Sequence, residues 1–208
     1  MIYYVYEWHL KRGLVKLPDN LCIMITEADL SHNPKKLADV TQWCISISDV
    51  VCSHHAASRP ISGITFHIDT EEPSHIEQFL PALRTIAHIA RLFLHYKDTV
   101  EESGVGIPVT IAIGKSGRGE IIDALKKMAD ERVDPDFLDE KVLESYLTFQ
   151  YTPDFVIKTG ASHLTDFLIW QSVYSELYFT DMDWCSMRNI DLLRALRDYQ
   201  DRIRRYGT

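Results

Sequence analysis

The sequence lacks a long uninterrupted apolar segment and an excess of basic residues. Its apolar runs break within about ten residues, which is too short for a membrane-spanning helix and unlike a secretory signal. There are 22 Lys and Arg residues against 30 Asp and Glu, giving a net charge of −8. Because nucleic-acid phosphates are bound by a basic face, this balance argues against a nucleic-acid partner. We expect a cytoplasmic protein.

Cysteine and metal-binding patterns are also scarce. The four cysteines, Cys22, Cys44, Cys52 and Cys185, are widely spaced and form no C-x-x-C pair. This spacing predicts reduced, mostly buried thiols rather than disulfides or a metal site. The nine histidines form no H-x-x-E-H or H-x-x-x-H array, so no common zinc motif is present.

What is present fits one globular domain spanning residues 1–208. The chain has a mass of 24.0 kDa, with 46% hydrophobic and 25% charged residues, values ordinary for a protein with one sizeable core. Strand-like runs alternate with helical patterns, which predicts an α/β fold with a central, mostly parallel sheet of about six strands flanked by helices. We place strands near 21–25, 45–51, 62–68, 108–113, 154–158 and 177–179, and helices at 3–12, 34–43, 75–98, 118–132, 139–147, 164–174 and 189–205.

The most informative block is residues 154–179, which read D-F-V-I-K-T-G-A-S-H-L-T-D-F-L-I-W-Q-S-V-Y-S-E-L-Y-F. An apolar strand breaks at Lys158 into small residues, at the edge where open α/β sheets bind ligands. The block resembles the cis-prenyltransferases (undecaprenyl diphosphate synthase family), whose usual text is P-D-L-L-I-R-T-x-G-E-x-R-L-S-N-F-L-L-W-Q-x-x-Y-x-E-x-Y-F. The resemblance extends over nearly the whole chain and implies the cis-prenyltransferase fold.

The first family signature is P-x-H-V-A-I-I-M-D-G-N-x-R-W, in which the Asp holds Mg²⁺ at the departing diphosphate. The matching run, Pro18–Leu30, reads P-D-N-L-C-I-M-I-T-E-A-D-L. Thr26 therefore replaces the essential carboxylate, and a hydroxyl is a much weaker ligand for a hard cation. The added Glu27 and Asp29 would each repel a diphosphate by roughly 1 to 4 kcal/mol at about 4 Å. We interpret this pocket as catalytically inactive, with no metal expected in this chain.

The isopentenyl diphosphate site of the family is also altered. In R-T-x-G-E-x-R-L-S, two arginines and a serine bind the diphosphate, and here they become Lys158, His163 after a one-residue deletion, and Thr165. Two guanidinium forks are thereby replaced by a point charge and an imidazole. The resemblance implies a weak substrate site, and an ordinary loop at the strand end is the alternative.

Two further motifs surround this cleft. The turn Gly114–Glu120 reads G-K-S-G-R-G-E and resembles the family's G-Y-G-G-R-x-E, which places Arg118 at the edge of the active site. Its position between a strand and a helix suits an anion, although a purely structural turn is an equal alternative. The family's F-S-T-E-N-W becomes F-H-I-D-T-E over residues 66–71, without the Ser and Trp. Glu176 matches the family's acidic residue near the metal, and we expect it to persist as a structural polar group rather than an Mg²⁺ ligand.

The C-terminus differs because its family motif is intact. In the family the terminal R-x-G crosses to the neighbouring subunit and binds the substrate diphosphate, and here it is Arg205-Tyr206-Gly207. A solvated, basic helix end is the alternative. Losses thus fall within the chain's own pocket, whereas the group acting in trans is retained. This resembles the non-catalytic accessory subunits of the Nogo-B receptor type, in an archaeal-like form.

The resemblance therefore implies an inactive subunit of a heteromeric cis-prenyltransferase, which supplies Arg205 and Gly207 to a catalytic partner. That partner would hold Mg²⁺ and join isopentenyl diphosphate to an allylic diphosphate, making polyprenyl diphosphate for a glycosyl carrier lipid. We expect contact through a face that includes residues 164–179.

Two other functions stay open. A divergent, self-sufficient homodimer would need Glu27 or Asp29 to hold the metal. A non-enzymatic binder of prenyl diphosphates or membranes would retain the fold alone, and the aromatic segment Tyr3–Leu10 allows peripheral contact with a membrane surface.

Overall fold

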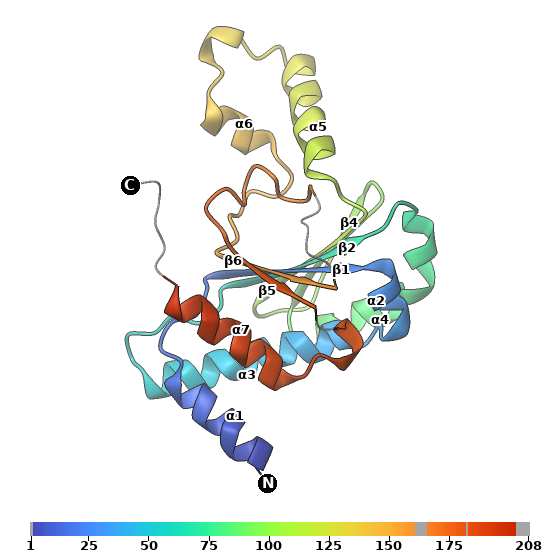
Figure 1. The fold of residues 1–208 in the computed structure, drawn as a ribbon. Helices are drawn as coiled ribbons and strands as arrows, with labels where there is room; N and C mark the ends of the chain where they lie inside the picture. Colours follow the sequence, from blue (N-terminus) through green and yellow to red (C-terminus); the bar gives the residue numbers. More distant parts are fainter. Residues whose placement is uncertain (1, 161–165, 182, 203–208) are drawn as a thin grey trace.

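The computed structural model describes residues 2–160, 166–181 and 183–202, and it is built around one seven-stranded sheet (Figure 1). The strand order is β4-β3-β5-β2-β1-β6-β7, and only the β3–β4 pair is antiparallel. The strands are β1 (Asn20–Thr26), β2 (Gly63–Asp69), β3 (Arg91–Tyr96), β4 (Thr99–Ser103), β5 (Pro108–Ile113), β6 (Phe155–Thr159) and β7 (Glu176–Thr180).

Helices lie on both sides of this sheet, with α3 and α7 on one side and α5 and α6 on the other (Figure 1). The α-helices are α1 (Ile2–Gly13), α2 (Glu27–His32), α3 (Lys36–His54), α4 (Leu80–Arg84), α5 (Gly117–Asp130), α6 (Glu140–Tyr146) and α7 (Asn189–Asp201). Short 3₁₀ helices are η1 (Pro73–Phe79), η2 (Thr85–His88), η3 (Pro135–Phe137) and η4 (Trp184–Ser186). None of the described helices is long and apolar enough to cross a membrane.

The two faces of the sheet are chemically different because side chains alternate along each strand. On β1, Leu21, Ile23 and Ile25 join the main apolar core with residues of α3 and α7. Cys22 and Met24 face the other side, where a smaller cluster includes Phe149, Phe167 and Leu168. Each fully buried Leu or Ile of the main core contributes about 1.5–3 kcal/mol. The second face also holds the buried polar side chains of Thr65, His67 and Lys158.

The prediction of a strand at 45–51 is wrong, because these residues belong to α3. The run Ile45–Val51 has the β-branched composition of a strand, but its buried members recur at helical spacing: Cys44, Ile47 and Val51 are all fully buried. Tertiary burial of this stripe against the sheet overrides the local strand propensity.

The prediction of one long helix at 75–98 is also wrong. The chain instead forms η1, α4 and η2, then turns into the hairpin of β3 and β4. Buried residues in β3 alternate, with Leu92, Leu94 and Tyr96 inward, so the apolar pattern changes from helical to strand period near residue 90. Strands β3 and β4 are both absent from the predicted set, and together with the five correctly predicted strands they make the sheet seven-stranded.

Near the C-terminus, the predicted helix 164–174 is not formed in its described part, residues 166–174, which consists of turns. Leu168 there has a left-handed φ of 54°. The helix predicted at 189–205 ends earlier, at Asp201, since Arg202 is extended with ψ 137°. The helix predicted at 34–43 is present but continues to His54 as α3, and the remaining predicted helices and strands lie within a few residues of their expected bounds.

Candidate active-site edge

Thr26 is the last residue of β1, and its side chain is already bonded within the chain. Its hydroxyl donates to Asp29 Oδ2 at 2.8 Å and accepts from the Asp29 amide at 3.2 Å. Asp29 Oδ2 also accepts from the Thr26 amide at 2.9 Å, completing a capping box at the start of α2. Thr26, which stands where the family signature has its metal-binding Asp, therefore serves as a helix cap.

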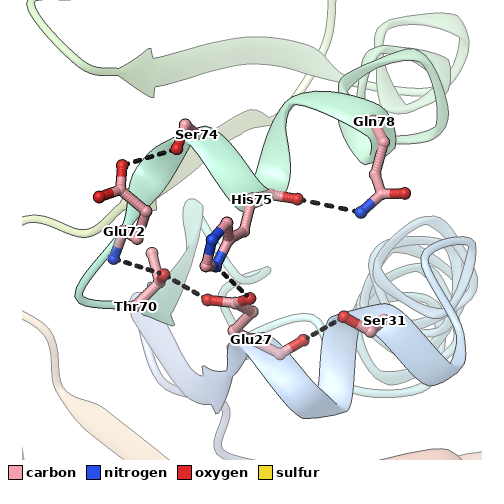
Figure 2. A network of polar contacts seen from close by, with 7 residues as sticks. All are labelled: Glu27, Ser31, Thr70, Glu72, Ser74, His75 and Gln78. Atoms are coloured by element: carbon pink, nitrogen blue, oxygen red, sulfur yellow. Dashed lines mark hydrogen bonds and ion pairs between the residues drawn. The ribbon is translucent and has the colours of Figure 1, made fainter.

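The neighbouring Glu27 bridges α2 to the segment that follows β2 (Figure 2). Its two carboxylate oxygens face Thr70 Oγ1 at 2.5 Å and His75 Nδ1 at 3.1 Å. Thr70 Oγ1 also accepts from the Glu72 amide at 3.2 Å. This network spans the side of a cavity of about 440 Å³ at the carboxyl ends of β1 and β2.

The cavity is acidic. Its lining contains one imidazole, that of His75, and four carboxylates, those of Glu27, Asp69, Glu71 and Glu72. Thr26, Ala28 and Thr70 complete the lining. The negative charges of these carboxylates would repel an incoming anion. Within the described residues, no three His, Cys, Asp or Glu side chains are grouped so that they could hold a metal ion.

Lys158 lies on the second face of the sheet and is only 2% exposed. In the sheet register, Lys158 of β6 and His67 of β2 both pair with Met24 of β1, the strand between them. His67 stacks on Phe167 with ring centroids 4.1 Å apart, and its Nε2 lies 2.9 Å from the carbonyl oxygen of Lys115. The expected substrate lysine is thus buried beside an aromatic stack.

His67 is the residue of this edge that the sequence analysis did not identify as a site. Burial lowers the pKa of its imidazole to about 4, and the nearby charge of Lys158 lowers it further, against the raising effects of the Lys115 carbonyl, Asp69 and Asp166. The ring is therefore neutral at pH 7 and donates through Nε2. Its Nδ1 is buried without a hydrogen-bond partner among the described residues. The sequence did offer one indication of His67, because it stands in F-H-I-D-T-E at the position where the family motif has Ser.

The turn before α5 binds an anion supplied by the chain itself. Ser116 Oγ donates to Asp166 Oδ2 at 2.7 Å, and the Gly117 amide donates to the Asp166 carbonyl at 3.1 Å. A Cβ on Gly117 would lie 2.2 Å from that carbonyl oxygen, so the close approach requires glycine. Arg118 is 3.9 Å from Asp166 Oδ2, with 78% of its side chain exposed.

Glu120, which matches the family motif, has a structural place. It accepts from the Phe149 amide at 2.6 Å and from Gln171 Nε2 at 3.2 Å. Burial raises the pKa of its carboxyl group, opposed by these hydrogen bonds. Glu120 and Gln171 therefore join α5 to the loop before β6 and to the turns after it.

Glu176 lies at the other edge of the sheet, where β7 begins. It pairs with Phe155 at the start of β6, so by register it is five residues back from Thr26, or roughly 16 Å along the strands. Its carboxylate faces Arg202 Nη1 at 3.4 Å, and the same nitrogen donates to the Leu177 carbonyl at 2.6 Å. Glu176 and Thr26 of one chain are therefore too far apart to share a metal ion.

The predicted residues His163, Thr165, Arg205 and Gly207 lie outside the described residues. Of the apolar side chains expected on the partner-facing surface, Phe167 and Leu168 are instead buried in this chain's own core. The exposed apolar residues of this region are Ile169, Val173, Tyr174 and Phe179.

Comparison with known proteins identifies the family. A family model described as "Putative undecaprenyl diphosphate synthase" matches residues 84–207, and the chain is 32% identical to "Isoprenyl transferase 1" of Corynebacterium efficiens over 100% of its own length and 97% of that protein. The chain belongs to the cis-prenyltransferase family. Another relative, a "Short-chain Z-isoprenyl diphosphate synthase" of Mycobacterium bovis, is 43% identical over 88% of this chain and 68% of the relative.

The fold of this family member agrees with solved structures. A probable undecaprenyl diphosphate synthase from Campylobacter jejuni superposes with a TM-score of 0.67, at 19% identity, covering 92% of this chain and 99% of that one. Lavandulyl diphosphate synthase from Lavandula x intermedia gives a TM-score of 0.70 with the same identity and coverage. These two likenesses concern the fold alone, which is the predicted α/β fold with a mostly parallel central sheet.

Proposed function

We propose that this chain is a catalytically inactive subunit of a heteromeric cis-prenyltransferase, comparable to accessory subunits of the Nogo-B receptor type. In this role it contributes Arg205 and Gly207 to the diphosphate site of a catalytic partner. The partner joins isopentenyl diphosphate to an allylic diphosphate with Mg²⁺ in its own site, releasing diphosphate and a proton. The product is a polyprenyl diphosphate for a glycosyl carrier lipid.

The observation that carries this proposal is the capping box of Thr26 and Asp29. The strand end that presents a carboxylate in active members here presents a hydroxyl, which donates to Asp29 at 2.8 Å. Asp29, one of the two candidate replacement ligands, is occupied by that bond and by the Thr26 amide. Both bonds fall on Oδ2 of Asp29, so Mg²⁺ bound through that oxygen would compete with the cap, whose loss costs about 0.5–2 kcal/mol.

The anion-binding features of the chain's own cleft are also engaged. The amide end of α5 faces Asp166 through Gly117 and Ser116, and the cavity beside Thr26 is lined by carboxylates. A diphosphate would have to displace Asp166 from the amide end of α5 and approach the cavity carboxylates against charge repulsion. These contacts support weak binding of substrate by this chain alone.

The position of Arg202 supports action on a neighbouring subunit. Arg202 is held to Glu176 and to the Leu177 carbonyl at the edge where β7 begins. Three residues of extended chain span at most about 11 Å, whereas Thr26 is roughly 16 Å away along the strands and two strands across. The described chain thus ends beside the amino edge of the sheet, which supports action of the following segment on another molecule rather than on the carboxyl edge of its own sheet.

The contact surface is the second part of the proposal. Ile169, Val173, Tyr174 and Phe179 expose between 43% and 68% of their surface on the 166–180 region. We infer that these exposed apolar side chains form the contact surface, since apolar patches are typical of protein interfaces. A mixed dimer through this face would bring the C-terminal segment of one subunit to the other.

A self-sufficient homodimer is the second candidate, favoured by the 32% identity to an isoprenyl transferase over the whole chain. In that case Glu27 would have to hold the metal. Its carboxylate oxygens already face Thr70 and His75, so metal binding would require this network to open.

Prenyl transfer measured with labelled isopentenyl diphosphate separates the two candidates. The chain is assayed alone, then mixed with a homologue of the same genome that carries the D-G-N-x-R-W text. We expect product only in the mixture. Turnover near about 1 s⁻¹ by the chain alone, within the usual range of enzymes, would replace the accessory role with the homodimer.

A further inference from the structure

A cavity of about 540 Å³ lies between α6 and the turns at 170–174, apart from the edge that contains Thr26. Its size falls in the range of ligand pockets. Aromatic side chains line part of it, namely those of Phe149, Trp170 and Tyr174. Two carboxylates one helical turn apart, Glu140 and Glu144 of α6, line another part.

The side-chain N–H donors of Trp170 and Gln150 in this lining are already used. Trp170 Nε1 donates to Glu144 Oε1 at 3.3 Å. Gln150 Nε2 donates to the carbonyls of Ser145 and Leu147 at 2.9 and 3.3 Å. Besides the ammonium group of Lys141, the polar lining offers acceptor capacity, because each carboxylate has several lone-pair sites.

Gln171 adds a buried acceptor to this set. It is 8% exposed, and its Nε2 donates to the Phe149 carbonyl at 2.7 Å and to Glu120. Its Oε1 is buried with no hydrogen-bond partner among the described residues. A buried acceptor without a donor is costly, so a small opening of the lining that let a ligand or a water donate a hydrogen bond to this oxygen would lower the free energy of the site.

Carboxylates beside aromatic faces favour a cation with several donors. Guanidinium meets both demands, because its planar fork binds carboxylates and its face stacks on aromatic rings. Lys141 is the one basic residue among the described residues of the lining, so the cavity keeps a net negative charge.

We propose that this cavity is a docking pocket for an arginine-bearing segment of the partner subunit. The inference rests on the proposed function, since it names the partner chemistry that the 166–180 surface accepts. Val173 and Tyr174, exposed by 68% and 59%, line the cavity and give it an exposed apolar rim. An arginine anchored in an aromatic pocket with an apolar rim is a common centre of binding energy at interfaces.

The first test uses a small probe and needs no partner. Acetyl-Gly-Arg-Gly-amide is titrated against the full chain, with the citrulline peptide, which has the same shape without the charge, as the matched probe. The indole N–H resonance of Trp170, assigned with Trp170→Phe, is followed by NMR. We expect a saturable shift with arginine and at least fivefold weaker binding of citrulline.

The variant Glu140→Gln/Glu144→Gln removes both charges while keeping an acceptor for the Trp170 bond. We expect it to weaken arginine binding about tenfold, between the values for exposed and buried charged pairs. The matched control Asp49→Asn/Glu77→Gln removes two exposed charges elsewhere and should change binding less than twofold. Equal binding of both peptides, or no saturation by about 100 mM, would overturn the proposal.

The second test measures dissociation of the mixed complex with the catalytic homologue. The Glu140→Gln/Glu144→Gln variant should raise the Kd about tenfold, and the control variant should leave it unchanged. If the mixed complex forms but its Kd does not respond, the arginine pocket fails while the proposed function stands. If no complex forms although arginine binds selectively, the proposed function fails and the cavity remains a guanidinium site.

Discussion

The two ends of the sheet have opposite roles in this chain. At the carboxyl edge, Thr26 is bonded to Asp29, and the turn before α5 is bonded to Asp166. At the amino edge, Arg202 is fixed to Glu176 and the Leu177 carbonyl. The polar groups at the carboxyl edge are thus bonded within the chain, whereas at the amino edge the last described residue, Arg202, is firmly held.

The largest expected difference between the two edges is catalytic. Because the carboxyl edge lacks the metal-binding Asp and is lined by carboxylates, this chain alone should give less than about 1% of the turnover of the mixed complex, a loss of more than roughly 2.7 kcal/mol in transition-state stabilisation. Radiolabelled isopentenyl diphosphate with a farnesyl or geranylgeranyl primer provides the measurement. Comparable turnover in both samples would mean that the carboxyl edge still works.

The second prediction concerns pH and the buried His67. Its pKa is lowered by burial to about 4 in the folded chain, against about 6.5 in the unfolded chain. As pH falls from 6.5 to 4 the unfolded state binds the proton first, so the free energy of unfolding should fall by up to about 3 kcal/mol. Urea unfolding of His67→Gln should show a flatter pH dependence than the wild type over this window.

The matched control for that measurement is His88→Gln, because His88 is exposed. This variant should retain the wild-type slope. If His67→Gln and His88→Gln gave the same pH dependence, protonation of His67 would not be linked to folding, and the physical account of the second face of the sheet would be wrong.

A third prediction tests the capping box. Thr26→Val removes the hydroxyl that accepts from the Asp29 amide and donates to its carboxylate, and it should lower the free energy of unfolding by about 1 kcal/mol. Thr26→Ser keeps the hydroxyl and should lie within about 0.5 kcal/mol of the wild type. Chemical denaturation of the two variants decides whether Thr26 stabilises α2.

The smallest expected effect is that of Thr26→Asp on activity. The new carboxylate would meet Asp29 at the oxygen that now accepts from the Thr26 hydroxyl, and Glu27 would keep its bonds to Thr70 and His75. We expect no gain of prenyl transfer by the chain alone. Robust product formation would show that one missing ligand explains the inactivity and that the other changes at this edge are harmless.

The fold was predicted correctly where a short apolar run stood alone and wrongly where two kinds of apolar pattern merged. Strands β1, β2, β5 and β6 are short apolar runs, and these were predicted correctly. Residues 45–51 were mistaken for a strand because β-branched residues are common to buried strands and buried helices. The hairpin of β3 and β4 was missed because Ile89 and Ala90 continue a helical stripe just where Leu92 and Leu94 begin to alternate.

The candidate site was only partly predictable. The resemblance located Thr26, Lys158 and Arg118, since their positions follow from matching text. Sequence patterns alone do not show that the Thr26 hydroxyl caps α2 or that Asp166 reaches the amide of Gly117, because both depend on the three-dimensional turns. The separation of Glu176 from Thr26 likewise appears only with the strand register.

The measurement closest to the central claim is the effect of Arg205→Ala in the mixed complex with a wild-type catalytic partner. If Arg205 binds the partner's diphosphate, its loss removes a charge-assisted bond of about 1.5–3 kcal/mol and lowers kcat/KM roughly 10- to 150-fold, with assembly unchanged. Arg197→Ala is the control, since the Arg197 side chain is half exposed on α7 and its Nε lies 4.0 Å from Asp201 Oδ2 of the same helix. Equal, small effects of the two substitutions would contradict a function in trans.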